Sequence, residues 1–427
     1  MPTFRFPLKQ HIGSPAAPVV SEGDWVQRGR LIAEKPAGAL GANLHASVSG
    51  AVSRVTAECV EILPDPGYEA ERGYVPLSGE TPMERIERSG LVGLGGAGFP
   101  TWAKLAPLPD GVVIMNAAEC EPILSHNIER LERGPEKAMA GLRIAMALTG
   151  AGRGVVAVKP GHERAMAALR PFLSEEIRLC PLPPHYPAGE ERAVVRQALG
   201  VLPGVDELPA AAGAAVFNAE TLHRLFEAVE EKKPMIDKDL TVAGKLAGPL
   251  TQVFFDVPVG LPAAALLERA GGASGYGEII LGGPFTGRRG SADAPVLKTT
   301  GGVLAAEEFP VRGRRLGLLV CACGADEARL REIAASMGCE VAGVETCRQA
   351  QRVRQALKCE NPGRCPGQVS KVLALKKAGA EEILIGNCAD CTNTVMSCAP
   401  QLGLAVHHAT DGALRAVNHR LIRKLTP

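Results

Sequence analysis

Several features that would assign a protein to a common class are scarce in this 427-residue sequence. Aromatic residues make up only 4% of it, so its cores are expected to consist mainly of Ala, Val, Leu and Ile. No apolar stretch reaches the roughly 18 residues that a membrane-spanning helix needs, so no membrane span is expected. Lys and Arg form no long run and the net charge is +1, so no nucleic-acid partner is expected. The first residues contain no apolar core of a secretion signal, which predicts a cytoplasmic location.

Cysteine, in contrast, is concentrated in one part of the chain. Nine of the twelve cysteines lie after residue 320. The cytoplasm keeps thiols reduced, so a structural disulfide framework is not expected. The concentration of cysteines therefore predicts metal binding or redox chemistry in the last part of the chain.

Apolar periodicity and turn residues divide the chain into four predicted domains of an α/β multidomain protein. Residues 1–80 contain short strands between turn glycines and resemble a lipoyl-like β barrel-sandwich, without a lysine where a prosthetic arm would attach. Residues 81–235 alternate short apolar runs with amphipathic helices, which indicates a Rossmann-like α/β domain. Residues 236–312 are again rich in strands. Residues 313–427 form a last α/β domain that contains most of the cysteines.

A glycine-rich segment lies near the start of the second domain, Gly93-Leu-Gly-Gly-Ala-Gly-Phe-Pro-Thr-Trp-Ala-Lys104. Glycine lets backbone N–H groups approach a phosphate without interference from Cβ, and a following helix N-terminus adds positive partial charge. Gly93, Gly95 and Gly96 are therefore candidate phosphate-binding residues, and Lys104 could neutralise the phosphate. Many glycine clusters of this kind are ordinary turns, so the segment alone is weak support for a nucleotide site.

Three polar segments follow the glycine loop along the chain. Asn116–Glu121 comes directly after an apolar strand and carries two carboxylates, at Glu119 and Glu121. Carboxylates repel a phosphate, but they suit ribose hydroxyls or the edge of an isoalloxazine or nicotinamide ring. Tyr186–Glu191 forms a second acidic turn with an aromatic ring available for stacking. Asn218–Thr221 supplies amide and hydroxyl groups after another apolar run.

In this order, the four segments resemble the motifs of a family of NADH–flavin electron-transfer proteins that includes the 51 kDa subunit of respiratory complex I and RnfC. The strands of residues 236–312 resemble the SLBB (β-grasp) module that follows in these proteins, and the lipoyl-like start is shared with RnfC. Leu94 stands where the complex I subunit has Arg, which removes one possible cofactor contact. Ala118 and Cys120 follow the RnfC pattern.

The resemblance implies that FMN and NADH bind in the second domain. It implies FMN in the glycine loop, with Asn116 on the flavin, and Asn218 and Thr221 closing the pocket. Acidic and aromatic residues between these positions would line the FMN and NADH pocket. The full set of implied cofactor-binding residues is Gly93, Gly95, Gly96, Lys104, Asn116, Glu119, Glu121, Tyr186, Gly189, Glu190, Glu191, Asn218 and Thr221.

The last domain lacks the iron–sulfur motifs of the proteins that the chain resembles, so their clusters are not implied here. Instead, a predicted strand at residues 382–385 runs into Cys388-Ala-Asp-Cys391 at the start of a predicted helix. A thiol at a helix N-terminus is shifted toward the thiolate, and C-x-x-C cysteines are close enough to form a disulfide. Cys388 and Cys391 are therefore candidate catalytic residues of a dithiol redox centre.

A metal ion or an iron–sulfur cluster is the alternative for the same cysteines. The candidate metal ligands are Cys347, Cys359, Cys365 and Cys388, with Cys391 as an alternative to Cys388. Cys321 and Cys323, at the end of a predicted strand, are further candidates. The C-x-x-C spacing fits a dithiol and a metal site equally well, and a purely structural zinc is a third, lesser option.

The end of the chain carries a second resemblance. Cys388-Ala-Asp-Cys-Thr-Asn-Thr-Val395 and the stretch from His408 onward are similar to the PrdC-type electron-transfer proteins associated with proline reductase. This similarity implies an NADH-dependent oxidoreductase that passes electrons through FMN and a cysteine-based centre to a protein partner, D-proline reductase. One alternative is a cobalamin reductase-like RnfC homologue, which the missing ferredoxin cysteines disfavour. The other is a non-catalytic scaffold subunit without a cofactor.

Overall fold

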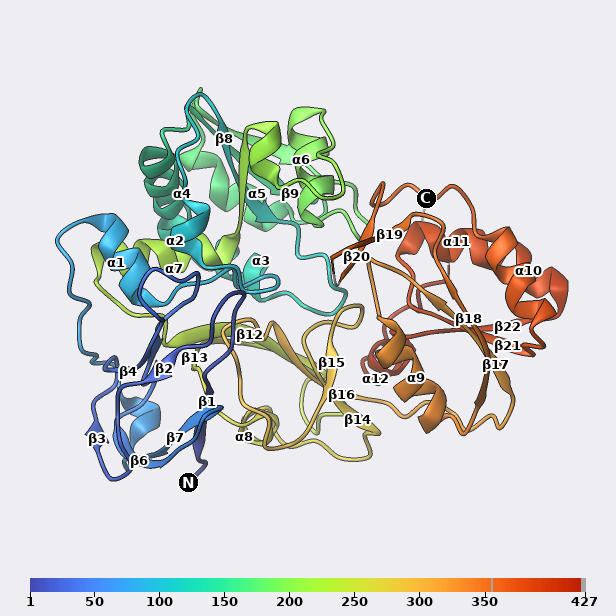
Figure 1. Ribbon diagram of the computed structural model, residues 1–427, viewed down its shortest axis with the longest axis horizontal. Coiled ribbons are helices and arrows are strands. Elements are labelled where there is room, and N and C mark those ends of the chain that lie inside the picture. Colours follow the sequence, from blue (N-terminus) through green and yellow to red (C-terminus); the bar gives the residue numbers. More distant parts are fainter. Residues whose placement is uncertain (355, 424–427) are drawn as a thin grey trace.

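The computed structural model describes residues 1–354 and 356–423 (Figure 1). The first part is built from two sheets, with strand orders β1-β7-β6-β3 and β2-β4-β5. The strands are β1 (Phe4–Pro7), β2 (Ala17–Pro18), β3 (Trp25–Val26), β4 (Leu31–Glu34), β5 (Leu44–His45), β6 (Gly50–Val55) and β7 (Cys59–Pro64). Phe4 and Phe6 alternate with less buried residues on β1, as expected for a strand with one face on a core.

The second part is a parallel sheet with helices on both faces, and its strand order is β10-β9-β8-β11. The strands are β8 (Val112–Ala117), β9 (Arg153–Val158), β10 (Ile177–Pro181) and β11 (Ala214–Asn218). The helices are α1 (Pro82–Ser89), α2 (Thr101–Lys104), α3 (His126–Arg133), α4 (Glu136–Thr149), α5 (Glu163–Leu169), α6 (Glu191–Leu199) and α7 (Ala219–Glu230). α4 and α7 pack against Met115 on one face, and α6 packs against Ile114 on the other. Because both faces of the sheet are buried, most of β8 is a continuous apolar run.

A five-stranded mixed sheet follows, with the order β13-β12-β16-β14-β15. Its elements are β12 (Asp237–Gly244), β13 (Thr251–Pro258), α8 (Ala263–Arg269), β14 (Glu278–Leu281), β15 (Arg288–Gly290) and β16 (Gly302–Ala306). Leu240 on β12 belongs to the same hydrophobic core as Phe4 and Phe6 of the first part. A buried ion pair of 2.6 Å between Arg28 and Asp237 also joins the two parts, so they fold onto one another.

The last part is a second parallel sheet, with the order β18-β17-β21-β22. Its strands are β17 (Arg315–Val320), β18 (Glu340–Thr346), β21 (Glu382–Ile385) and β22 (Ala405–His408), and its helices are α9 (Glu327–Ser336), α10 (Val369–Lys377), α11 (Ala389–Cys398) and α12 (Asp411–Ala416). A hairpin of β19 (Ala350–Val353) and β20 (Ala356–Cys359) lies between this part and the part that contains α6 (Figure 1). The predicted strand at 382–385 and the helix that begins after Cys388 are confirmed.

The mixed α/β multidomain architecture is confirmed as well. Within residues 1–354 and 356–423, every helix is too short or too polar to cross a bilayer.

Candidate functional site

Two asparagines lie side by side at the carboxyl ends of parallel strands. Asn116 on β8 pairs in register with Asn218 on β11. Ligands of parallel α/β sheets bind at this edge, because the loops that follow the strands meet there. Asn218 also caps α7, since its Oδ1 accepts hydrogen bonds from the backbone N–H groups of Glu220 (2.9 Å) and Thr221 (3.4 Å). The cap holds the asparagine side chain at the strand end.

The glycine loop is anchored to this strand end. The Oγ1 of Thr221 accepts a hydrogen bond of 3.0 Å from the backbone N–H of Leu94. A Cβ at Gly95 would lie 2.6 Å from the Nδ2 of Asn218, whereas a Cβ at Gly96 would have no neighbour within 4 Å. The Leu94 side chain is buried in the apolar core, so this position does not face a ligand. The loop therefore presents open backbone at Gly96, as a phosphate cradle requires.

Lys104 lies beside the loop and is held by an acidic partner. Its Nζ is 2.5 Å from Oε1 of Glu191, the first residue of α6. The ammonium also lies over the Phe217 ring, 5.5 Å from its centroid. Both partners remain partly exposed, with 26% and 39% of their side-chain surface accessible. A phosphate that entered here would compete with Glu191 for the ammonium group.

The acidic turn of Tyr186–Glu191 packs directly against the end of β8. Nδ2 of Asn116 donates to the carbonyl of Gly189 at 2.9 Å, and the N–H of Gly189 donates to Sγ of Cys120 at 2.7 Å. A Cβ at Gly189 would lie 2.9 Å from that sulfur, which explains the glycine. Glu190 caps α6 through the N–H of Ala193 at 2.9 Å, and burial raises the pKa of its carboxyl group.

Glu119 and Glu121 accept hydrogen bonds from segments other than the glycine loop. Glu119 accepts a hydrogen bond of 2.7 Å from the backbone N–H of Asn127 on α3. Glu121 accepts from the backbone N–H groups of Phe285 (2.7 Å) and Thr286 (2.9 Å) in the turn between β14 and β15. Burial raises the pKa of the Glu121 carboxyl group. Both carboxylates hold neighbouring segments against the α/β sheet.

Tyr186 connects the α/β sheet to the last part of the chain. Its ring stacks on Phe285 with 3.8 Å between centroids and 3° between planes. Its hydroxyl donates a hydrogen bond to the backbone carbonyl of Cys323. Phe285 in turn packs edge-on against His408, with 5.3 Å between ring centroids. The predicted cofactor segment Tyr186–Glu191 therefore borders the cysteine-rich part directly.

A cysteine cluster lies behind Tyr186. It consists of five buried and two partly buried cysteines, Cys321, Cys323, Cys347, Cys388 and Cys391, with Cys359 and Cys365. The thiols of Cys321, Cys347 and Cys391 lie within 4.8 Å of one another. Every cysteine lies in the described part of the chain and is a free thiol there. The cluster brings together all the candidate ligands named from the sequence.

Parallel strands bring these cysteines together. Cys321 directly follows β17, and Cys347 directly follows β18. Cys388, at the N-terminal boundary of α11, and Cys391, within α11, follow β21. The carboxyl ends of parallel strands meet at one edge, so residues far apart in the sequence converge there. Of the four ligands predicted from the sequence, Cys347 belongs to the tightest triad, and Cys359, Cys365 and Cys388 lie around it.

Amide and thiol contacts indicate which cysteines act together. Nε2 of Gln368 lies 3.1 Å from Sγ of Cys347, 3.3 Å from Sγ of Cys365 and 3.6 Å from Sγ of Cys391. The hydrogen bond to the Cys391 thiol lowers the pKa of Cys365 to about 6. Hydrogen bonding to the Cys321 thiol first, and then to its other neighbours, raises the pKa of Cys391. The shift to thiolate predicted at this helix N-terminus is therefore opposed at Cys391 by its crowded neighbours.

The donor set fits a thiophilic metal centre. Buried thiols at this spacing cannot all ionise side by side without a cation, because like charges repel in a low dielectric. Thiolates are the ligands that zinc and iron–sulfur clusters prefer. Both amide atoms of the buried Asn387, next to Cys388, have no hydrogen-bond partner in the described structure.

Two arginines of α6 bind residues 359–361, which begin with Cys359, one of the two partly buried cysteines of the cluster. Nη1 of Arg192 donates to the carbonyl of Cys359 at 2.5 Å, and Nη2 donates to the carbonyl of Glu360 at 3.0 Å. Nη1 of Arg196 donates to Oδ1 of Asn361 at 2.5 Å. One helix therefore reaches from the glycine loop, through Glu191, to the cysteine cluster.

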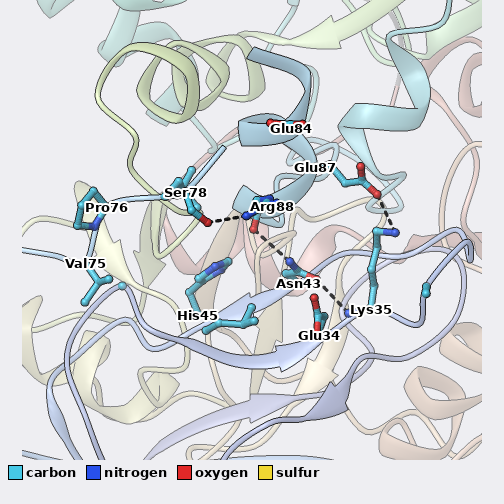
Figure 2. Close-up of a pocket in the computed structure, with 14 residues that line it drawn as sticks. Glu34, Lys35, Asn43, His45, Val75, Pro76, Ser78, Glu84, Glu87 and Arg88 are labelled. Carbon is cyan, nitrogen blue, oxygen red and sulfur yellow. Dashed lines mark hydrogen bonds and ion pairs between the residues drawn. The ribbon is translucent and has the colours of Figure 1, made fainter. Parts of the chain in front are cut away.

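A separate pocket of about 590 Å³ lies between β4, residues 75–78 and α1 (Figure 2). Nζ of Lys35 lies 2.8 Å from Oε1 of Glu87, and Nη1 of Arg88 donates to Oγ of Ser78 at 2.7 Å. The described lining of this pocket contains none of the predicted cofactor-binding residues. The glycine loop differs from this pocket in the open backbone that it presents at Gly96.

Comparison with protein families matches two parts of the chain. Residues 86–227 match the Nuo51 FMN-binding domain, and residues 2–63 match the RnfC barrel sandwich hybrid domain. The first match covers the glycine loop, both strand-end asparagines and the Tyr186–Glu191 turn. The barrel-sandwich fold expected for the first part is therefore confirmed.

Three relatives illustrate how far the similarity extends. Cobalamin reductase PduS of Salmonella typhimurium is 39% identical over 56% of this chain and 53% of its own length. Cobalamin reductase PduS of Citrobacter freundii is 33% identical over 82% of this chain and 74% of its own length. A component of the proton-translocating ferredoxin:NAD(+) oxidoreductase complex of Clostridium ljungdahlii is 31% identical over 70% of this chain and 69% of its own length. The matched region spans about half of the first of these relatives.

Proposed function

Because this chain belongs to the RnfC-like family of electron-transfer subunits with a Nuo51-type FMN-binding domain, we propose that it oxidises NADH and passes the electrons through its cysteine cluster to a partner reductase. FMN at the glycine loop is the entry point in this proposal. The cysteine cluster behind Tyr186 is the exit.

The contacts of the Tyr186–Glu191 segment are the observation that carries the proposal. At one end, the Tyr186 hydroxyl donates to the backbone carbonyl of Cys323. Three residues further on, Gly189 accepts a hydrogen bond from Asn116 at the end of β8. One short segment therefore borders both the candidate flavin site and the cysteine cluster, which is the arrangement that electron transfer between two centres requires.

FMN, when bound, supplies the capacity to take two electrons as a hydride and to release them singly or as a pair. The chain's own residues bind and orient it. The open backbone at Gly96 offers N–H groups, and Lys104 offers a positive charge to the phosphate once Glu191 releases it. Asn116 and Asn218 form the polar floor at the strand ends. The stacked rings of Tyr186 and Phe285 exclude water between this floor and the cysteines.

An iron–sulfur cluster is the proposed exit centre. Its ligands are Cys321, Cys347 and Cys391, with Cys365 as the fourth, because the amide of Gln368 faces three of these four sulfurs. A dithiol would need Cys388 and Cys391 as an isolated pair. The thiol of Cys391 instead lies within 4.8 Å of the thiols of both Cys321 and Cys347. This crowding favours a metal centre over a dithiol.

D-proline reductase is the proposed acceptor, and the similarity of the Cys388–Val395 segment to PrdC-type proteins supports it. A corrinoid is the second candidate acceptor, because two of the relatives are cobalamin reductases. The two candidates differ in the chemistry of the acceptor but share the same entry from NADH.

Anaerobic purification tests the entry and the exit together. We expect a flavin absorbance band that NADH bleaches, FMN as the released flavin, and about four irons and four sulfides per chain for a four-cysteine cluster. Purified protein without flavin absorbance would refute the proposed function. Protein with flavin but without iron and sulfide would refute the iron–sulfur cluster and favour the dithiol of Cys388 and Cys391 as the exit centre.

Acceptor identity is tested with two parallel assays on the same preparation. NADH-dependent reduction of D-proline in the presence of D-proline reductase supports the first candidate. NADH-dependent reduction of cob(II)alamin, with no rate toward proline reductase, supports the second. A rate with neither acceptor would refute both.

A further inference from the structure

Residues 348–364 carry an unusual excess of positive charge. Five basic residues occur in this segment against one acidic residue, Glu360, although the whole chain has a net charge of only +1. The basic residues are Arg348, Arg352, Arg354, Lys358 and Arg364. They are spaced between uncharged residues, so they form no continuous run in the sequence.

The hairpin of β19 and β20 and the residues that flank it display these charges to solvent. The four arginines are exposed and Lys358 is half-buried. Within residues 1–354 and 356–423, none of the five takes part in an ion pair of 4 Å or less. Some exposed arginines elsewhere are neutralised, as Arg331 is by Glu327 at 2.8 Å. Unpaired charges of one sign on a surface create a field that attracts a partner of the opposite sign.

The basic hairpin, residues 348–354 and 356–364, lies over the least covered edge of the cysteine cluster. A pocket of about 490 Å³ opens here, and its lining includes Arg348 and Gln349 directly after Cys347. The lining also includes Glu360 and Asn361 directly after Cys359, Pro366 directly after Cys365, and Leu202. Cys359 and Cys365 are partly exposed, whereas the triad behind them is buried. An acceptor that approaches the cluster with little intervening protein therefore meets the basic hairpin.

We propose that the basic hairpin is the docking surface for an electron-acceptor protein whose own docking face is acidic. The proposal rests on the proposed function, since it takes the cysteine cluster as the exit for electrons. The unpaired arginines steer and orient the acidic partner, and the exposed Val201 next to Leu202 supplies an apolar contact at the pocket. The segment contains no aromatic residue, so it lacks the stacking platform that single-stranded nucleic acid uses.

Binding to charged probe proteins tests the docking surface independently of catalysis. The full-length protein is titrated with an acidic flavodoxin, a basic cytochrome c and a single-stranded RNA oligonucleotide, and binding is followed by fluorescence anisotropy. We expect at least about tenfold tighter binding of flavodoxin than of cytochrome c at low salt, and weakening by about tenfold between 20 and 200 mM salt. Equal affinity for flavodoxin and cytochrome c, or tighter binding of RNA than of flavodoxin, would overturn the proposal.

A matched pair of triple variants localises the effect. One variant combines Arg348→Gln, Arg352→Gln and Arg354→Gln, and the control combines Arg54→Gln, Arg153→Gln and Arg164→Gln, which are exposed elsewhere. Both variants lose three positive charges. We expect the first to weaken flavodoxin binding at least about tenfold and the control to weaken it less than about twofold. An equal loss in both would mean that net charge alone acts, which would overturn the docking surface.

A separate assay keeps the two proposals distinguishable. NADH oxidation is measured with menadione, a small uncharged acceptor that needs no docking surface. Absent NADH oxidation with intact, hairpin-dependent flavodoxin binding would refute the proposed function and support the docking surface. Normal NADH oxidation, together with flavodoxin binding that does not depend on the hairpin, would support the proposed function and refute the docking surface.

Discussion

Nη1 of Arg192 donates a hydrogen bond of 2.5 Å to the backbone carbonyl of Cys359. The two residues are 167 positions apart in the chain. Arg192 lies in the first turn of α6, directly after Glu191, the partner of Lys104. This contact makes α6 a rigid connection between the glycine loop and the cysteine cluster. A change at either end of the helix is therefore expected to affect the other.

Replacing Arg192 tests this connection. Arg192→Met removes donors to the carbonyls of Pro203, Cys359 and Glu360 and leaves these groups unpaired. We expect the free energy of unfolding to fall by roughly 2–4 kcal/mol, because the buried carbonyl of Pro203 and two partly buried carbonyls lose their donors. Electron transfer from flavin to the cysteine cluster is expected to slow, which stopped-flow absorbance measures. Arg143→Met is the control, since the exposed Arg143 makes one hydrogen bond, to the carbonyl of Phe172. Equal effects of the two substitutions would contradict the connection.

Gly95 is expected to be essential for flavin binding. In Gly95→Ala the new Cβ lies 2.6 Å from Nδ2 of Asn218, so either the loop or the helix cap of α7 must shift. We expect FMN affinity to fall by at least about tenfold, measured by titrating flavin-free protein with FMN. Gly152→Ala is the matched control, because a Cβ there has no neighbour within 4 Å. Retention of wild-type affinity by Gly95→Ala would show that the loop adapts and is not a fitted cradle.

Thr221 anchors the glycine loop through its hydroxyl group. Thr221→Val preserves the shape but removes the acceptor for the backbone N–H of Leu94, whose hydrogen bond is 3.0 Å long. We expect a loss of about 1–3 kcal/mol in the free energy of unfolding, measured by urea denaturation, together with weaker FMN binding. Thr221→Ser keeps the hydroxyl and is expected to restore flavin binding. If the serine variant binds FMN as weakly as the valine variant, the hydrogen bond is not the cause.

Lys298 is expected to make stability depend on pH. Burial lowers the pKa of Lys298 from 10.5 to about 7, and its Nζ donates to the carbonyls of Asn43 (2.6 Å) and Gly90 (2.7 Å). Between these pH values the unfolded chain binds one proton more than the folded chain, so the stability contributed by this group rises with pH. The rise is roughly 1.4 kcal/mol per pH unit, and the contribution is at its lowest below pH 7.

Lys298→Met isolates that contribution. The variant loses two hydrogen bonds as well as the charge, so the slope of stability against pH is compared and not its absolute value. We expect urea unfolding at pH 7, 8 and 9 to show a smaller slope for the variant than for the wild type. Parallel slopes would mean that the pKa of Lys298 is the same in the folded and unfolded states.

Cys391 is expected to be required for the metal centre. Its thiol lies within 4.8 Å of those of Cys321 and Cys347. We expect Cys391→Ser to lose most of the bound iron and sulfide, measured by chemical analysis after anaerobic purification, because an alcohol is a poor ligand for iron–sulfur clusters. Cys398→Ser is the control, because the Cys398 thiol bonds only to backbone carbonyls of its own helix. Equal iron in both variants would rule out Cys391 as a ligand.

Local patterns in the sequence predicted the individual elements well. The strand at 382–385 and the helix after Cys388 follow from an apolar run and a change of periodicity, and both are confirmed. The segments that begin at Asn116 and Asn218 stand out in the sequence because each follows an apolar run. The contacts of Glu119 and Glu121 could not be anticipated in this way. Their hydrogen-bond partners lie on α3 and in the turn between β14 and β15, which the sequence does not show to be neighbours.

The basic hairpin was missed for a related reason. A search for runs of Lys and Arg fails when uncharged residues separate the basic ones, as between Arg348 and Arg352. Pairing of β19 with β20 brings Arg352 and Lys358 onto one short hairpin, with Arg354 in its turn. A count of charge over residues 348–364 would have found them, so the signal was present in the sequence.

The sequence by itself determined the chemistry that this protein can perform. Gly93–Lys104 and the segments of Asn116, Tyr186 and Asn218 indicate flavin binding, and the cysteines after residue 320 indicate a thiol-based centre. Tertiary structure alone decided that Cys321, Cys347 and Cys391 form the triad and that Tyr186 lies against Cys323. The physical reason is that parallel strands align their carboxyl ends. Which residues meet there depends on strand order and helix packing, and local sequence patterns do not encode either of these.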